Sequence, residues 1–215
     1  MRKAPDHASD RDSRRQERRQ QMVEAAVRVI RREGPDASMD RFAAEAGVAK
    51  PILYRVFGDR AGLHRAVGEH AFASLGAGLD QVLATAGVAP RQMVADAINT
   101  YLAFVEREPE LYRFLALRAD PVSRRQAVDD YLTRVSRQVA VVIGDRLRSV
   151  GRDSGAAEAW AYGIVGMAVA AGSWWLEHGA MSRVQLGAYL TQLVCDGLPG
   201  IPREASEPAP RTDLG

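Results

Sequence analysis

Apolar residues follow a helical period along most of the chain. The first stripe is formed by Val23, Val27 and Ile30, which recur at steps of three and four residues, and the Gly-Pro pair at 34–35 ends that helix. The alternation typical of strands is absent from the sequence, and so is any internal repeat with the spacing of a solenoid. We therefore predict an all-α fold.

Breaks in this pattern divide the rest of the chain into further helices. Asp59 is a suitable N-cap for a helix that starts at residue 60, and glycine and proline residues mark most of the later boundaries. The expected helices cover residues 60–83, 93–108, 110–118, 124–150, 156–178 and 183–196. The segment 199–215 is rich in proline and polar residues, which predicts a disordered tail.

Two short amphipathic helices separated by a tight turn are predicted between residues 38 and 60. Ser38 is a good N-cap for the first, and Gly47 stands where that helix must stop. The second starts at Lys50, with a proline just inside it, where a missing N–H costs nothing. Leu53 and Phe57 then share the inward face, which leaves the outward face to Lys50, Ile52, Tyr54 and Arg55. A helix pair of this kind is typical of proteins that insert a helix into a DNA groove.

The residues that carry this pattern also point to a family. The stretch GVAKPILYRVFGDRAGL resembles the helix-turn-helix signature of TetR-type transcriptional regulators, in which a GVSxxxLYxxF core is followed by a charged residue and a leucine. The resemblance covers residues 14–80 and is architectural beyond them. It implies an N-terminal three-helix DNA-binding domain followed by a helical domain for effector binding and dimerisation.

The resemblance also assigns roles to individual residues. Groove-facing positions fall on Lys50, Pro51, Ile52 and Arg55. Phosphate-contacting positions fall on Tyr54 and Arg60, and Ser38 and Met39 begin the helix that lies against the DNA backbone. For Tyr54, packing in the core is the alternative. Lys50 or Arg55 is suited to reading guanine, whereas Pro51 and Ile52 offer only apolar contact to thymine.

Charge is distributed unevenly between the two ends of the chain. The formal net charge is only +2, yet residues 1–65 hold 15 basic and 10 acidic groups, whereas the remaining residues hold 14 and 17. An N-terminal basic excess suits a DNA-binding end joined to a body without affinity for polyanions, although a solvated face alone would also produce it.

Arginines crowd the junction between the polar N-terminus and the first helix. We expect residues 1–13 to form a disordered basic arm, followed by the DNA-binding domain at 14–60. The arginines at this junction, with Arg14 and Arg15 as the expected DNA contacts, can enter the adjacent minor groove or simply solvate a helix end. They are Arg11, Arg14, Arg15, Arg18 and Arg19.

Composition narrows the classes of protein to which this chain can belong. The chain has 215 residues, 47% of them hydrophobic, and one cysteine, which leaves no intramolecular disulfide framework and indicates the bacterial cytoplasm. The longest apolar segment, 161–176, is shorter than the roughly 20 residues that span a bilayer, so no membrane partner is expected. Nucleotide-binding and hydrolase motifs are absent and the histidines lack ligand spacing, so we predict no enzyme, no cofactor and no metal.

Residues 61–198 are expected to form the helical effector-binding and dimerisation domain, with helix 60–83 as its connector to the DNA-binding domain. The resemblance implies an apolar effector cavity in this domain. The candidate effector contacts are Tyr101, Phe104, Tyr112, Phe114, Tyr131, Met167, Trp174 and Trp175. We expect fewer than half of them to touch the ligand and the others to belong to the core.

The last two predicted helices, 156–178 and 183–196, contain many small residues, which permit close helix packing. The resemblance implies that they pair with a second copy across a two-fold axis, the alternative being a bundle within one chain. A symmetric dimer requires a palindromic operator on double-stranded DNA. The leading hypothesis is a homodimeric repressor released by a small apolar or amphipathic effector. The alternatives are a regulator, repressor or activator, without an effector and, less favoured, an all-helical enzyme.

Overall fold

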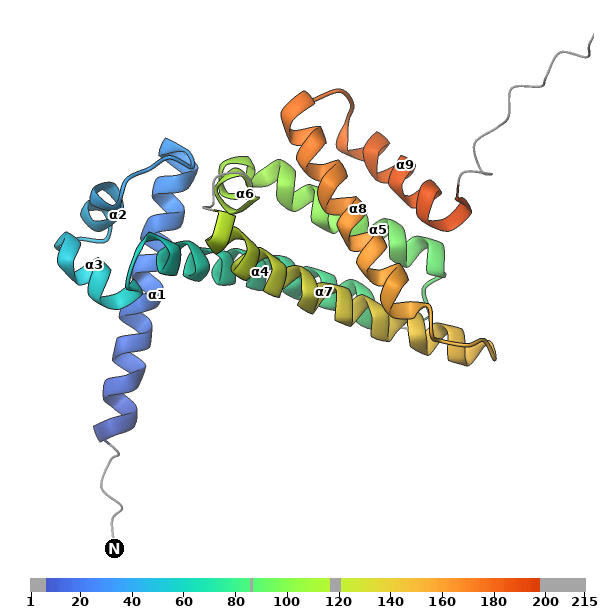
Figure 1. Cartoon of the computed structure of the whole chain (residues 1–215), viewed down its shortest axis with the longest axis horizontal. Coiled ribbons are helices and arrows are strands. Elements are labelled where there is room, and N and C mark those ends of the chain that lie inside the picture. Colours follow the sequence, from blue (N-terminus) through green and yellow to red (C-terminus); the bar gives the residue numbers. More distant parts are fainter. Residues whose placement is uncertain (1–6, 86, 117–120, 198–215) are drawn as a thin grey trace, which may run out of the picture.

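The computed structural model describes residues 7–85, 87–116 and 121–197, and Figure 1 shows how its helices are arranged. No strand occurs within these ranges, so the predicted all-α fold is confirmed. The boundaries lie close to those predicted from the sequence for every helix that follows residue 34. The helices are α1 (His7–Glu33), α2 (Met39–Glu45), α3 (Lys50–Phe57), α4 (Arg60–Ala84), α5 (Pro90–Arg107), α6 (Pro109–Ala116), α7 (Pro121–Ser149), α8 (Ala157–His178) and α9 (Arg183–Asp196).

The first helix differs from the prediction. The expected disordered arm covered residues 1–13, but α1 already begins at His7, so this prediction is wrong for residues 7–13. Once the packed half of α1 is formed, each added residue gains one hydrogen bond, and the glutamines, arginines and glutamate of 14–21 are good helix formers. Residues 1–6 and the predicted tail 199–215 lie outside the described ranges.

The N-terminal unit packs α1, α2 and α3 with the beginning of α4 around one core. Phe42 of α2 and Leu53 of α3 are fully buried in it, together with Leu63 of α4. On α1, apolar residues at helical spacing supply the other wall, as the sequence pattern predicted. These residues are Val23, Ala26, Val27, Val29 and Ile30.

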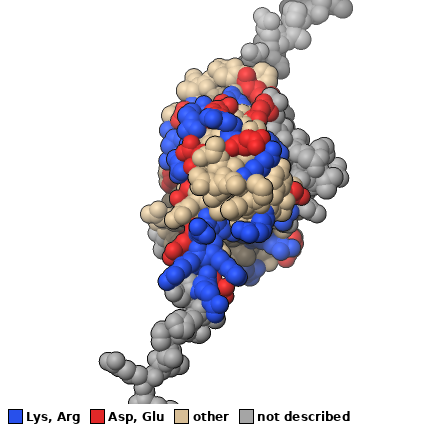
Figure 2. Space-filling model, turned by 90° about the vertical axis from the view of Figure 1, so that its left-hand side faces the viewer, with Lys and Arg blue, Asp and Glu red and all other residues tan. Residues whose placement is uncertain are grey.

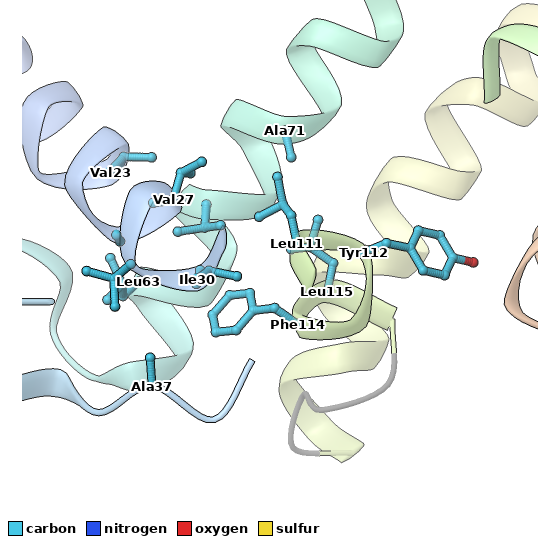
Figure 3. Packing of buried hydrophobic residues seen from close by; sticks show 14 of the residues in the cluster. Val23, Val27, Ile30, Ala37, Leu63, Ala71, Leu111, Tyr112, Phe114 and Leu115 are labelled. Atoms are coloured by element: carbon cyan, nitrogen blue, oxygen red, sulfur yellow. The ribbon is translucent and has the colours of Figure 1, made fainter. Parts of the chain in front are cut away.

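Helices α4 and α6 join this unit to the rest of the molecule. Figure 3 shows Leu111, Phe114 and Leu115 of α6 turned toward α1 and α4, whereas Tyr112 points the opposite way. The buried side chain of His64 on α4 lies 3.0 Å from the carbonyl oxygen of Phe114 and tilts against its ring. Helix α6 is therefore a wedge between the two parts of the chain, a role that the sequence did not indicate.

The C-terminal body consists of α5, α7, α8 and α9 with the second half of α4. Helix α8 packs along α7, and α9 packs along α5. Arg183 and Arg91 tie α9 to α5 near its two ends, through ion pairs to Glu106 at 2.9 Å and Asp196 at 2.7 Å. Between them lies Gly187, where an added Cβ would stand 2.9 Å from the side-chain oxygen of Asn99. This small residue serves contact within the chain rather than the predicted pairing with a second copy.

Candidate DNA-binding surface and ligand cavity

Local sequence builds the helix-turn-helix as predicted. The Ser38 hydroxyl accepts a hydrogen bond from the backbone N–H of Arg41 at 3.3 Å and thereby caps α2. The turn to α3 passes through Gly47 with a φ of 64°, a left-handed conformation that glycine adopts without a Cβ clash. Leu53 and Phe57 are buried, and together they hold the inner face of α3 against the core.

The outer face of α3 leaves Lys50, Pro51, Tyr54 and Arg55 exposed, in the positions that the sequence predicted for them. Ile52 differs, because it is half-buried and packs against the core. Ile52 therefore faces outward only in part, because its apolar side chain gains from contact with the neighbouring apolar cluster.

Three other predicted contact residues have structural partners. The side chain of Met39 is buried in the core, so only its main chain at the start of α2 is left for the predicted contact with the DNA backbone. Arg60 donates to the carbonyl oxygen of Ala37 at 2.9 Å, directly before the α2 cap. Lys50 pairs with Asp40 of α2 at 2.9 Å, and this hydrogen bond raises the pKa of Lys50. Lys50 must exchange this carboxylate for a base or phosphate if it is to contact DNA.

A cluster of ion pairs fixes α2 on α1. Glu33, at the end of α1, accepts hydrogen bonds from Arg41 at 2.8 Å and from Arg32 at 2.9 Å. Glu45, at the end of α2, forms ion pairs with Arg28 and Arg32, each with an N–O distance of 3.0 Å. The bond from Arg41, followed by that from Arg32, lowers the pKa of Glu33 to about 2. The helices around α3 are thus held together by surface ion pairs as well as by their apolar core.

The N-terminal arginines are presented by helix rather than by an extended arm. Arg11, Arg14, Arg15 and Arg18 recur at spacings of three and four residues on α1, so they share one side of it. Arg19 lies 5.4 Å over the ring of Phe57. Figure 2 shows basic side chains gathered toward the N-terminal end of the chain on the face that carries α2 and α3. This arrangement extends the basic surface along α1, beyond the helix-turn-helix.

The body contains a partly open cavity of about 810 Å³. Its size falls in the range of small-molecule sites, which is on the order of 300 to 1,000 Å³. Four helices and the loop after α4 contribute to its walls, and aliphatic side chains dominate them. Those on α4, α5, α7 and α8 include Leu75, Leu79, Leu83, Val94, Ile98, Leu132, Val135, Val139, Val142, Ile143, Ile164, Val165 and Val169.

Most of the residues considered as effector contacts lie outside the cavity wall. Only Tyr101 is part of the wall. Phe104, Tyr112, Phe114 and Trp175 belong to the buried core, because the gap between α6, α1 and α8 is where large rings are needed to fill space. Two further members of the set lie outside the wall, Met167 packed against the core and Trp174 exposed on the surface. The side chain of Tyr131 lies outside the described residues.

One polar link joins the cavity wall to α6, and a second joins the junction of α5 and α6 to α1. The hydroxyl of Tyr101 lies 3.0 Å from that of Tyr112 on α6, which lies 2.7 Å from the Ser173 hydroxyl on α8. Between the domains, the Arg31 guanidinium of α1 donates twice to Glu108, both at 2.7 Å. Glu108 stands between α5 and α6, so this ion pair joins α1 to the junction of those two helices.

The face formed by α8 and α9 exposes much apolar surface. Ten large hydrophobic side chains are exposed in the described residues, and six of them belong to these two helices: Trp160, Tyr162, Trp174, Val184, Tyr189 and Leu193. The sequence-predicted small residues Gly163, Gly166 and Ala170 are exposed on the same helix α8. An uncovered apolar face of this extent marks an interaction surface.

Helix α8 also has the length and apolar character of a membrane-crossing segment, the one such helix found in the described residues. The segment considered from the sequence, 161–176, was too short, but the helix runs through Ala157–His178. It packs along α7 and carries Glu158 and Glu177 near its ends.

Titratable side chains do not converge on a metal site. Within the described residues, no group of three or more histidine, cysteine or carboxylate side chains is placed to hold an ion. Cys195 on α9 is exposed, and partial burial of its thiol raises its pKa, which lowers its reactivity at neutral pH.

Comparison with known proteins places these features in one family. Residues 22–67 match the model of bacterial regulatory proteins of the tetR family, and residues 78–209 match that of the tetracyclin repressor-like C-terminal domain. An uncharacterised HTH-type transcriptional regulator of Mycobacterium tuberculosis is 34% identical over 194 residues, which cover 86% of this chain and 79% of the relative. The chain belongs to the TetR family of DNA-binding transcriptional regulators.

Two further similarities bear on the direction of regulation and on the fold. The HTH-type transcriptional activator FasR of Mycolicibacterium smegmatis is 30% identical over 165 residues, covering 76% of this chain and 74% of that protein. The transcriptional regulator FadR from Bacillus subtilis, solved in complex with stearoyl-CoA, superposes with a TM-score of 0.68 at 17% identity, covering 83% of this chain and 98% of that structure. The FadR likeness establishes a shared fold.

Proposed function

We propose that this protein is a homodimeric repressor that binds a palindromic operator through α3 and releases it when a small hydrophobic molecule enters the cavity in the body. Such a regulator acts in the bacterial cytoplasm. The observation that carries the effector part is the cavity of about 810 Å³ with its aliphatic walls. The stearoyl-CoA bound to the FadR neighbour supports a ligand with an acyl chain.

The dimer proposal rests on the exposed face of α8 and α9. Tyr189 is 58% exposed and Val184 is 68% exposed. Exposure of this extent is unfavourable for large apolar side chains in water. A two-fold pairing through this face would bury both, and it would place two copies of α3 on successive turns of DNA. Inverted-repeat operators follow from that symmetry.

Release of DNA by a ligand requires a structural element with two arrangements. Both the cavity and the DNA-binding surface must influence the equilibrium between these arrangements. Helices α4 and α6 are suited to this role, because α4 carries Leu63 in the N-terminal core and Leu79 in the cavity wall. Arg31 and Glu108 add a second connection. A ligand that fits the DNA-incompetent arrangement better would then supply a coupling of about 1 to 3 kcal/mol.

The activator relative supports a second candidate, in which operator binding raises transcription. Both candidates share the same DNA surface and cavity. A reporter gene behind the selected operator separates them: deletion of the regulator raises expression under the repressor proposal and lowers it under the activator alternative.

The DNA-binding part is tested by selecting operators from random duplex DNA and measuring affinity by mobility shift. We expect an inverted repeat to be enriched and Lys50→Ala to weaken binding by about 1 to 3 kcal/mol. Asp40→Ala is the matched control, since it removes the partner of Lys50 and an acidic group beside the phosphates. It should leave affinity unchanged or raised; a loss equal to that of Lys50→Ala would assign the pair a structural role instead.

The dimer is tested by light scattering on purified protein. Tyr189→Glu, in the exposed α9 face, should shift the mass from two chains to one, because burying a carboxylate in an apolar interface is costly. Val141→Glu is the control, since Val141 is similarly exposed on α7, at 60%, outside that face. A single-chain mass for the unaltered protein would contradict the proposal.

A further inference from the structure

The polar residues of the cavity wall are concentrated at one end. Aliphatic residues surround the inner part, where Leu75 and Ile98 are buried. The outer end lies between the loop after α4 and the last turns of α7, and the wall residues there are exposed. They are Ala84, Thr85, Gly87, Pro90, Asp145, Arg146 and Ser149. The cavity therefore opens to water at this end, on the side of the body away from α1 to α3 (Figure 1).

All but one of the polar side chains in this wall already have partners. Gln138 donates to Asp80 at 3.0 Å, the Thr85 hydroxyl to the carbonyl of Gln81 at 2.8 Å, and the Ser149 hydroxyl to that of Arg146 at 2.8 Å. The carboxylate of Asp145 is neutralised by Arg148 at 2.7 Å.

Arg146 is the exception. Among the residues that the structure describes, no carboxylate oxygen lies within 4.0 Å of its guanidinium nitrogens. The neighbouring charges are balanced, since Asp145 pairs with Arg148 and, at the start of α5, Arg91 pairs with Asp196. Among the described wall residues, Arg146 is thus a guanidinium at the open end without an ion-pair partner.

We propose that the cavity takes an amphipathic anion, whose aliphatic chain lies along α7 and whose carboxylate or phosphate head group is held by Arg146. This rests on the proposed effector function and names the ligand's chemistry. A planar guanidinium binds either head group through paired, charge-assisted hydrogen bonds. The aliphatic walls hold the chain without polar contacts, so selectivity resides at the open end.

The head-group position fixes the direction of the chain. Leu132 and Arg146 are 14 residues apart on α7, which corresponds to about 21 Å of helix. A chain anchored at Arg146 extends inward toward Tyr101, whose hydroxyl contacts Tyr112 on the wedge helix α6.

The test compares ligands that differ in the head group alone: dodecanoate, dodecyl phosphate and dodecan-1-ol. Binding to the full-length protein is measured by calorimetry, and operator affinity is measured in parallel. We expect at least one of the two anions to bind about tenfold more tightly than the alcohol. Arg146→Gln should remove this preference and leave the affinity for the alcohol unchanged. The anion whose affinity falls more in Arg146→Gln identifies the natural head group.

Arg134→Gln is the matched control, because Arg134 is exposed on α7 but is not part of the cavity wall. It should bind all three ligands like the unaltered protein. Equal affinity for anions and alcohol, or an equal loss of all three in Arg146→Gln, would overturn the head-group assignment while leaving the hydrophobic effector in place. If none of the three binds, the aliphatic cavity is not an effector site, and operator binding is judged separately by its own assay.

Discussion

The two ends of α4 belong to regions that are built in opposite ways. Around Leu63 the N-terminal unit is closely packed, with Phe42, Leu53 and Val67 fully buried and an ion-pair cluster on its outside. Around Leu79 the body leaves about 810 Å³ empty and exposes an apolar face on α8 and α9. One helix thus joins a closely packed region to one that contains a pocket.

This difference suits the two tasks. Reading DNA requires that α3 keep a constant position on its support, because base contacts depend on hydrogen-bond geometry. Sensing a ligand requires a site that costs the fold little stability when it is empty and that changes its structure when a ligand binds. The two polar links through Tyr112 and Glu108 cross the boundary between these regions.

The largest effect is expected when the same substitution is made at both ends of α4. Leu63→Ala deletes a side chain with 0% exposure and should lower the free energy of unfolding by about 2 to 5 kcal/mol. Leu79→Ala enlarges a space that is already empty and should cost much less, because few packing contacts are lost there. Urea unfolding measures both. Equal losses would show that the cavity wall is as tightly packed as the N-terminal core.

Two glycines of α4 sharpen the comparison. A Cβ added at Gly62 would lie 1.8 Å from the carbonyl oxygen of Phe57, so Gly62→Ala must move the end of α3. The expected cost is about 1 to 3 kcal/mol, with a loss of operator binding. At Gly76 nothing lies within 4 Å, and Gly76→Ala should stabilise the helix by about 0.5 to 1 kcal/mol without affecting DNA. Wild-type operator affinity in Gly62→Ala would contradict this account of the α3–α4 junction.

The smallest effect concerns pH. Bonds from Arg41 and Arg32 lower the pKa of Glu33 from 4.5 to about 2, so the folded state holds its proton less tightly than the unfolded state. Its stabilising contribution is complete above pH 4.5 and is lost as the pH falls toward 2. Glu33→Gln should therefore flatten the acid side of the stability profile, followed by circular dichroism. The exposed Glu17→Gln is the control and should retain the slope.

Much of the DNA-binding surface could be predicted because its determinants are local. Ser38, Gly47 and the proline at 51 act on the backbone within a few residues, and Leu53 and Phe57 are inward by helical period alone. Ile52, expected on the outward face but half-buried in the structure, is a side chain at the edge of a face. There the neighbouring helix decides which side chains are covered, and periodicity does not locate that helix.

The sequence by itself determined the helical class, the boundaries of most helices, the helix-turn-helix and the basic side of α1. These follow from interactions between residues close in the chain. Only the tertiary structure decided that aliphatic rather than aromatic residues line the cavity, that Arg146 stands at its open end, and that α6 wedges between the two regions. Those features join segments far apart in sequence, and the rings were drawn into the core because that is where they fill the most space.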